Sequence, residues 1–145
     1  MKPGVDQILN TSAMQLMANV APQLPAGYAQ SSASLLGFMM MLSAQEYDRA
    51  ADIRAAENAD IRALFAEIAG AVKDAALKTK LEAAAKTEDG SLKISALDTA
   101  NYKMRRLLIE AQAHVESQGS PAAEKKIWTV LRAAADRRVL KMPGS

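Results

Sequence analysis

The sequence predicts an all-α protein, a single-domain helical bundle of four to five helices around a long central helix at about residues 31–72. The composition is rich in residues that lose little side-chain entropy in a helix, such as Ala, Leu, Met, Glu and Lys. Aromatic residues make up only 4% of the chain, and β-branched residues are thinly spread. Apolar residues recur at intervals of three and four, the spacing of a helical face. A length of 145 residues is that of one ordinary domain.

The first predicted helix covers residues 5–21. Its apolar and small residues share one helical face: Val5, Ile8, Leu9, Ser12, Ala13, Leu16, Met17 and Val20. Pro22 and Pro25 end this helix, because proline cannot continue one. A loop is expected to follow as far as Gln30, with Gly27 available for a turn.

The central helix is predicted over residues 31–72, with Ser31 or Ser32 as its cap. Its first turns, from Leu35 to Leu42, are apolar on every side, which is typical of a buried helix. A helix of this length would be roughly 60 Å long, so a kink or a break is an alternative. The predicted inner stripe consists of Leu36, Met39, Met40, Ser43, Tyr47, Ala50, Arg54, Glu57, Asn58, Ile61, Phe65, Ile68 and Val72.

Three further helices are predicted at residues 73–86, 95–118 and 121–140, followed by a frayed tail at 141–145. The first has a narrow apolar face of Ala76, Leu77, Leu81 and Ala84. The second has a heptad-like seam of Leu97, Asn101, Met104, Leu108, Ala111 and Val115. The boundary before the last helix is Gly119-Ser120-Pro121, where glycine ends one helix, serine caps the next and proline takes its first position. The last helix has Ala123, Ile127, Leu131 and Ala134 on one face.

The first 45 residues contain only two charged side chains, Lys2 and Asp6, although the whole chain has 18 basic and 16 acidic residues. We expect this opening segment to be covered, by the rest of the chain or by a second copy, because a large uncharged surface is hard to solvate. The predicted interface residues are Leu35, Leu36, Met39, Met40 and Met41. The preferred function is a non-catalytic interaction or accessory protein that forms a homodimer or packs on a protein partner.

A polar layer interrupts the apolar stripes. Arg54, Glu57 and Asn58 lie within one turn of the central helix, and Asn101 interrupts the later seam. A hairpin through residues 73–86 brings the chain back to this level, where Arg54 and Glu57 can pair and the two amides can complete a network. The layer is interpreted in three ways: it sets helix register, it is solvated at a kink, or it lines a pocket for a small molecule. The pocket is the alternative function, with Arg54, Glu57, Asn58 and Asn101 as ligand-binding residues.

Catalytic and metal sites are not predicted. The chain has no cysteine, which excludes disulfides, thiolate ligands and thiol nucleophiles. His114 is the single histidine, and it is interpreted as part of a solvated ladder with Arg106 and Glu110 rather than as a metal ligand. Glycine-rich phosphate-binding motifs and a serine nucleophile motif are absent, so no cofactor is expected.

Partners and compartment follow from charge and hydropathy. A net charge of +2 gives no support to nucleic-acid binding. The basic residues of the last helix, among them Arg137 and Arg138, are explained by the dipole at its carboxyl end. The longest apolar run is far shorter than the roughly 20 residues of a membrane span, and no secretory signal is apparent. We therefore expect a cytoplasmic protein.

Overall fold

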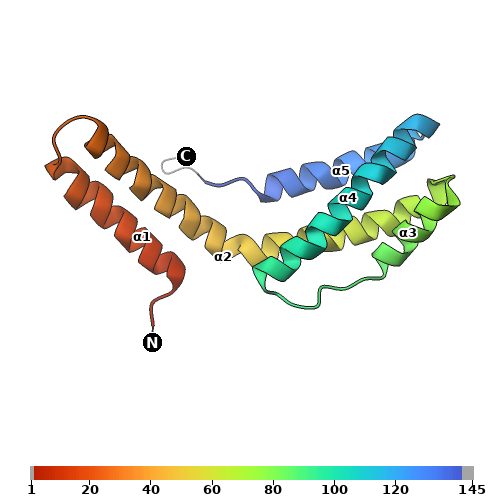
Figure 1. The fold of residues 1–145 in the computed structure, drawn as a ribbon, viewed down its shortest axis with the longest axis horizontal. Coiled ribbons are helices and arrows are strands. Elements are labelled where there is room, and N and C mark those ends of the chain that lie inside the picture. Colours follow the sequence, from red (N-terminus) through yellow and green to blue (C-terminus); the bar gives the residue numbers. More distant parts are fainter. Residues whose placement is uncertain (1, 142–145) are drawn as a thin grey trace. The chain divides into compact units, whose positions relative to one another are not determined.

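The computed structural model describes residues 2–141, which form five α-helices linked by short turns and contain no strand (Figure 1). The predicted all-α class with a long central helix is confirmed. Contacts divide the chain into two compact units. Unit 1 comprises the described residues up to Ala50 together with 140–141, and unit 2 comprises Ala51–Val139. The prediction of a single domain stays a prediction.

Unit 1 contains a helical hairpin. Helix α1 spans Val5–Gln15 and is continued by a π-helical turn at Leu16–Val20 and a 3-10 turn at Ala21–Gln23, where the prediction had one regular helix. Helix α2 spans Tyr28–Ile68 and gives its first part to this unit. It begins directly after Gly27, whose φ of 140° favours glycine, so the predicted caps Ser31 and Ser32 lie inside the helix.

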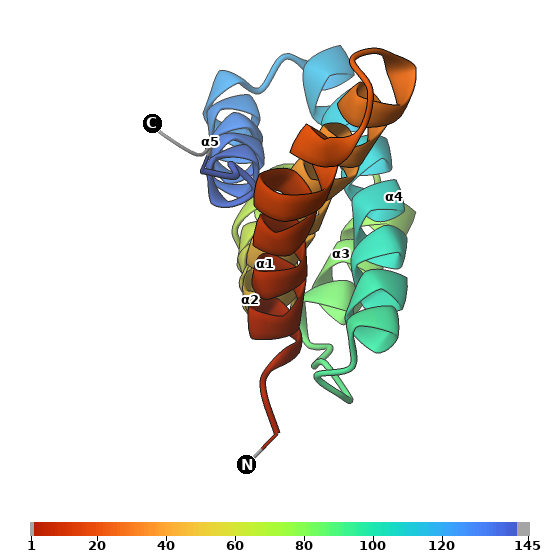
Figure 2. The same cartoon turned by 90° about the vertical axis from the view of Figure 1, so that its left-hand side faces the viewer.

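The interior of unit 1 is built from small residues. Helix α1 runs alongside the first part of α2 (Figures 1 and 2). The two helices approach closely at Gly37, where an added Cβ atom would clash with the Cγ of Met17 and lie 3.2 Å from the carbonyl oxygen of Ala13. The buried apolar residues among those described in unit 1 are all alanines, namely Ala13, Ala21, Ala33, Ala44 and Ala50. No large side chain among them reaches full burial.

The first part of α2 differs from the prediction. Its turns around Leu35–Leu42 are not a buried core, because Leu35, Leu36 and Met39 are 58%, 56% and 54% exposed. The inner stripe is therefore wrong at Leu36, Met39, Ser43 and Tyr47, which all face water in the single chain. The buried side of the helix passes instead through Ala33 and Ala44, where close helix contact selects small residues.

Unit 2 contains the rest of α2 and three more helices. A 3-10 turn at Ala69–Ala71 ends α2, and α3 (Ala75–Ala85) begins at Asp74, whose Oδ1 atom accepts a hydrogen bond of 2.7 Å from the backbone N–H of Leu77. Helix α4 spans Ile94–Gln118 and ends at Gly119 in the left-handed conformation, with φ of 65°. Helix α5 spans Pro121–Arg137. Pro121 is its first residue as predicted, but the side chain of Ser120 makes no capping hydrogen bond.

Unit 2 has the large apolar core that unit 1 lacks. Every residue of the predicted α4 seam is buried: Leu97, Asn101, Met104, Leu108, Ala111 and Val115. The stripe of α2 is correct from Ala50 onwards except at Arg54, which is only partly buried, and Ile61, Phe65 and Ile68 are almost completely buried. Leu77 and Leu81 of α3 and Ile127 of α5 complete this core. The heptad-like spacing therefore predicted the buried side of α4, whereas Ile53 and Leu64 of α2 are buried without having been predicted and Ala76 is exposed.

The end of the described chain returns to unit 1. The side chain of Gln45 holds the backbone of Lys141 by two hydrogen bonds, one donated by Gln45 Nε2 (2.9 Å) and one donated by the N–H of Lys141 (3.0 Å). Lys141 is thus tied down, whereas a frayed tail was predicted there, and residues 142–145 of that tail lie outside the described residues. None of the helices within residues 2–141 is long and apolar enough to cross a membrane.

Candidate functional site

The predicted polar layer lies in unit 2, and three of its four residues are buried. Glu57 is 1% exposed, Asn58 0% and Asn101 7%. The side-chain amide of Asn101 donates to Asn58 Oδ1 at 3.0 Å, so the structure brings the two interruptions of α2 and α4 into direct contact. The interpretation of the layer as solvated is therefore wrong for these three residues.

Two arginines hold the buried carboxylate of Glu57. Arg105 of α4 donates to Oε1 through Nε at 2.7 Å and also through Nη2. Arg138, just after α5, donates to Oε2 through Nε at 3.2 Å and through Nη2 at 2.6 Å. Burial raises the pKa of Glu57, but the hydrogen bonds from Arg138, Arg105 and Asn101 outweigh it, so the pKa lies below the usual value. The carboxylate is ionised and joins three helices.

A second carboxylate, that of Asp89, contacts the layer through Asn58 and Arg62. Its two oxygens accept hydrogen bonds from Arg62 of α2, at 2.6 Å from Nη2 to Oδ1 and 3.2 Å from Nη1 to Oδ2. Asn58 also donates to Asp89 Oδ1 at 3.0 Å and to the carbonyl oxygen of Leu97 at 3.3 Å. The ion pair with Arg62 lowers the pKa of Asp89, burial opposes this, and Asn58 lowers it further. The turn after α3 is thereby attached to α2.

Arg54, the fourth predicted residue, lies at the edge of the layer with its side chain 15% exposed. Its Nε atom donates to Asp98 of α4 at 2.6 Å. The sequence missed the partners that satisfy the layer, which are Arg62, Asp89, Asp98, Arg105 and Arg138. Arg105 lies one turn after Asn101 on the flank of the seam, and this spacing was the signal that could have revealed it.

The basic residues of α5 have acidic partners on α2. Arg137 pairs with Asp60 at 2.5 Å, and Lys126 pairs with Glu67 at 2.8 Å. The prediction explained the basic residues of this helix by the helix dipole alone. The structure shows that two of them, Lys126 and Arg137, also form ion pairs with α2 within unit 2.

His114 and Glu110 do not belong to a metal site among the described residues. Glu110 pairs with Lys80 of α3 at 3.1 Å, rather than standing only in a ladder with Arg106 and His114. The Nε2 atom of His114 is buried, and nothing among residues 2–141 hydrogen-bonds it. Within the same residues, no cluster of three or more histidine, aspartate or glutamate side chains is arranged to hold a metal ion.

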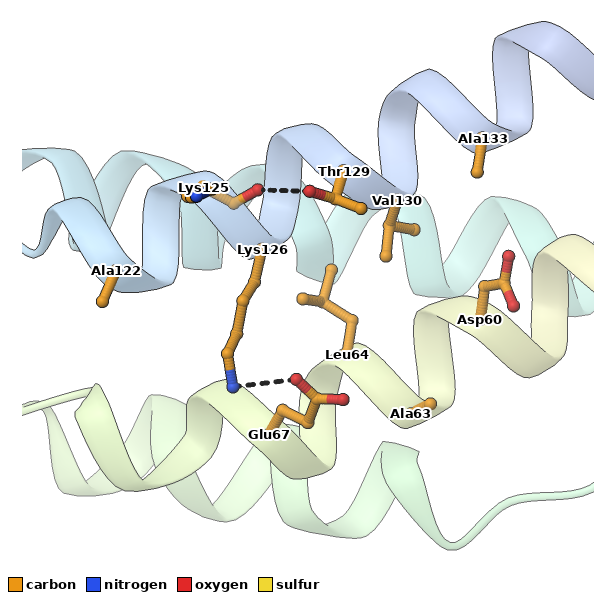
Figure 3. Close-up of a pocket in the computed structure, with 10 residues that line it drawn as sticks. All are labelled: Asp60, Ala63, Leu64, Glu67, Ala122, Lys125, Lys126, Thr129, Val130 and Ala133. Atoms are coloured by element: carbon orange, nitrogen blue, oxygen red, sulfur yellow. Dashed lines mark hydrogen bonds and ion pairs between the residues drawn. The ribbon is translucent and has the colours of Figure 1, made fainter.

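A groove in unit 2 lies between α2 and α5 and has a volume of about 530 Å³. Figure 3 shows Leu64 and Val130 pointing into it and Lys126 reaching across it to Glu67. A second groove of about 350 Å³ lies beside α3 and α4. Neither groove is lined by Arg54, Glu57, Asn58 or Asn101. The buried residues of the layer therefore do not line these two grooves, although Arg62, which pairs with Asp89, is one of the residues that line the second one.

Comparisons of this chain with protein family models, with curated proteins and with solved structures find no match. A carboxylate held by two arginines, with amides that bond each other, provides neither a free base nor an activated nucleophile. It fastens α2, α4 and α5 in one register.

Proposed function

We propose that the protein is a non-catalytic assembly protein that self-associates through unit 1. The observation that carries this proposal is the contrast within unit 1 between an interior of alanines and an exterior with large apolar side chains. We call the outer side of α2 formed by Leu35, Leu36, Met39, Ser43 and Tyr47 the α2 face. All five residues are exposed in the single chain.

Energetics support an additional surface over unit 1. Burial contributes about 0.8 kcal/mol for each CH₂ group, and an alanine side chain offers one methyl group. Ordering the backbone costs about 1–2 kcal/mol per residue, so a hairpin that buries only alanines completely gains little against this cost. Covering the α2 face adds large apolar side chains to the buried set. Two hairpins packed together would form a four-helix bundle.

The charge pattern supports a second copy as the covering surface. Only Lys2 and Asp6 are charged before Glu46, so the α2 face meets its own copy without burying an unpaired charge up to that residue. A surface of this kind offers no charge pattern by which to select a different partner. Symmetric dimers are the commonest soluble oligomers, and their interfaces are self-complementary. Of the predicted interface residues, Leu35, Leu36 and Met39 lie on this face, whereas Met40 and Met41 are half-buried within the chain.

The test is the double variant Leu36→Glu/Met39→Glu, measured by sedimentation velocity over a range of protein concentrations. We expect wild type to dimerise and the variant to do so about 100-fold more weakly or worse, because burying an unpaired charge costs several kcal/mol and about 1.4 kcal/mol is a factor of ten. The matched control is Ile109→Glu in α4, an apolar residue of unit 2 that is 67% exposed. A wild-type monomer, or equal weakening by both variants, would contradict the proposal.

The small-molecule pocket remains the alternative function, and the contacts of the layer favour it less. Asn58 and Glu57 already bond protein groups at every side-chain oxygen and nitrogen, so a ligand would have to displace these partners. The predicted consequence of a pocket, that Glu57→Ala abolishes stabilisation by a ligand, is a direct test. Register between helices is the role that the buried network supports best.

A further inference from the structure

The α2 face contains one small side chain, Ser43, among four large ones. Its members follow one another at helical spacing, and buried Ala33, Gly37 and Ala44 lie on the opposite side. Met39 and Ser43, one turn apart, lie at its centre, and Leu35 and Tyr47 lie further out. Each pair is symmetrically placed about position 41. Across the midpoint, large Met39 is matched with small Ser43, and Leu35 with Tyr47.

Ser43 is suited to burial at such a centre. Its hydroxyl group donates to the carbonyl oxygen of Met39 at 2.9 Å, so the polar atom is satisfied within its own helix. The small side chain leaves a hollow between the larger residues before and after it on the face. A methionine side chain is flexible enough to fill a hollow of irregular shape.

We propose that the occupant of the α2 face is the α2 helix of a second copy, running antiparallel and centred between Met39 and Ser43. This inference rests on the proposed function and adds the geometry of the pair. In this arrangement Met39 of each copy fills the hollow at Ser43 of the other. Leu35 of each copy meets Tyr47 of the other, so two equivalent sets of contacts are formed about one axis.

A parallel pair in register fits the same face less well. It would place Met39 opposite Met39 and Ser43 opposite Ser43. The two methionines would then be overpacked, and the two serines would leave a void between the helices. Protein interiors are close-packed, and both overpacking and voids destabilise them. The size pattern therefore selects the antiparallel direction.

Disulfide cross-linking tests the arrangement cleanly, because the chain has no cysteine of its own. Met39→Cys and Ser43→Cys are purified separately, one of them isotopically labelled, then mixed and oxidised. A disulfide needs Cα atoms within about 7 Å. We expect the mixed 39–43 disulfide to exceed each same-site disulfide several-fold. Asp48→Cys is the control, since Asp48 is exposed one turn after buried Ala44, away from the face.

The outcomes separate this geometry from the proposed function. Dominant same-site disulfides, or mixed yields no higher than those of the control, overturn the antiparallel pair if sedimentation still shows a dimer of both variants. In that case self-association stands and only the geometry falls. If the unmodified protein sediments as a monomer at every concentration, the proposed function and this inference both fail.

Discussion

Glu57 is the residue whose chemistry is most tightly constrained in unit 2. It is almost fully buried, ionised, and bonded to arginines from two other parts of the chain. Removing its charge leaves Arg105 and Arg138 facing each other without a counterion. Because their side chains are 45% and 42% exposed, water compensates part of this loss.

We expect Glu57→Gln to lower the unfolding free energy of unit 2 by about 2–3 kcal/mol at neutral pH, because one partner of a buried ion pair is lost. The measurement is chemical denaturation followed by circular dichroism. Glu82→Gln is the control, since Glu82 lies on the surface of α3 with its side chain 49% exposed. Equal stability of the two variants would count against a structural role of the layer.

The same variant gives a pH dependence with a definite sign. The pKa of Glu57 is below its usual value of 4.5 in the folded protein, so the unfolded chain binds more protons between these two values. The stabilisation is complete above 4.5 and is lost as the pH falls through the folded pKa. We expect wild type and Glu57→Gln to converge in unfolding free energy in acid. A constant difference from neutral pH into acid would refute this.

At this scale the sequence predicted the buried polar residues better than their partners. Asn58 and Asn101 interrupt apolar stripes, and a stripe marks a buried face whatever residue stands in it. Arg105 lies on the flank of α4 and Arg138 directly follows α5, and a charged residue at such a position is usually solvated. Only the packing of α4 and α5 on α2 shows that these side chains reach Glu57.

Gly37 sets the contact between α1 and α2 at the scale of helices. We expect Gly37→Ala to lower the unfolding free energy of unit 1 by about 1–3 kcal/mol, because the new Cβ atom would clash with Met17 Cγ and crowd the carbonyl oxygen of Ala13. This is opposite to the gain of about 0.5–1 kcal/mol that alanine normally gives over glycine inside a helix. Thermal unfolding by circular dichroism measures the change.

Gly70 provides the matched control. It lies in the 3-10 turn after α2, and a Cβ atom there would meet nothing within 4 Å. Gly70→Ala is expected to be neutral or slightly stabilising. If Gly37→Ala also proves stabilising, α1 does not pack closely on Gly37 in solution.

Periodicity predicted the elements of unit 2 but misplaced the buried side in unit 1. In α4 the apolar positions form one narrow seam, so the seam and the buried face coincide. The turns of α2 around Leu35–Leu42 are apolar all round, and such a segment has no polar side to show which way it faces. In the structure, the side of α2 with Ala33 and Ala44 is buried, and the side with Leu35, Leu36 and Met39 is exposed.

For the whole molecule, the two units differ in what stabilises them. Unit 2 has a core of large side chains, whereas unit 1 is proposed to need a second copy. We therefore expect amide hydrogen exchange in α1 and the first part of α2 to slow as protein concentration rises, since association stabilises the associated state by mass action. Exchange in the cores of α4 and the second part of α2 should not depend on concentration. Protection of unit 1 that is unchanged on dilution would contradict self-association.

The ion pairs of Glu57 with Arg105 and Arg138 also affect the order in which the helices of unit 2 can pack. The carboxylate comes from α2, and its two counterions come from α4 and from the end of α5. A folding intermediate in which α5 has not yet docked would enclose a negative charge with half its neutralising groups missing, and such a species is penalised relative to both the unfolded and the native chain. We therefore expect the network to disfavour partly docked intermediates and to favour cooperative formation of this unit.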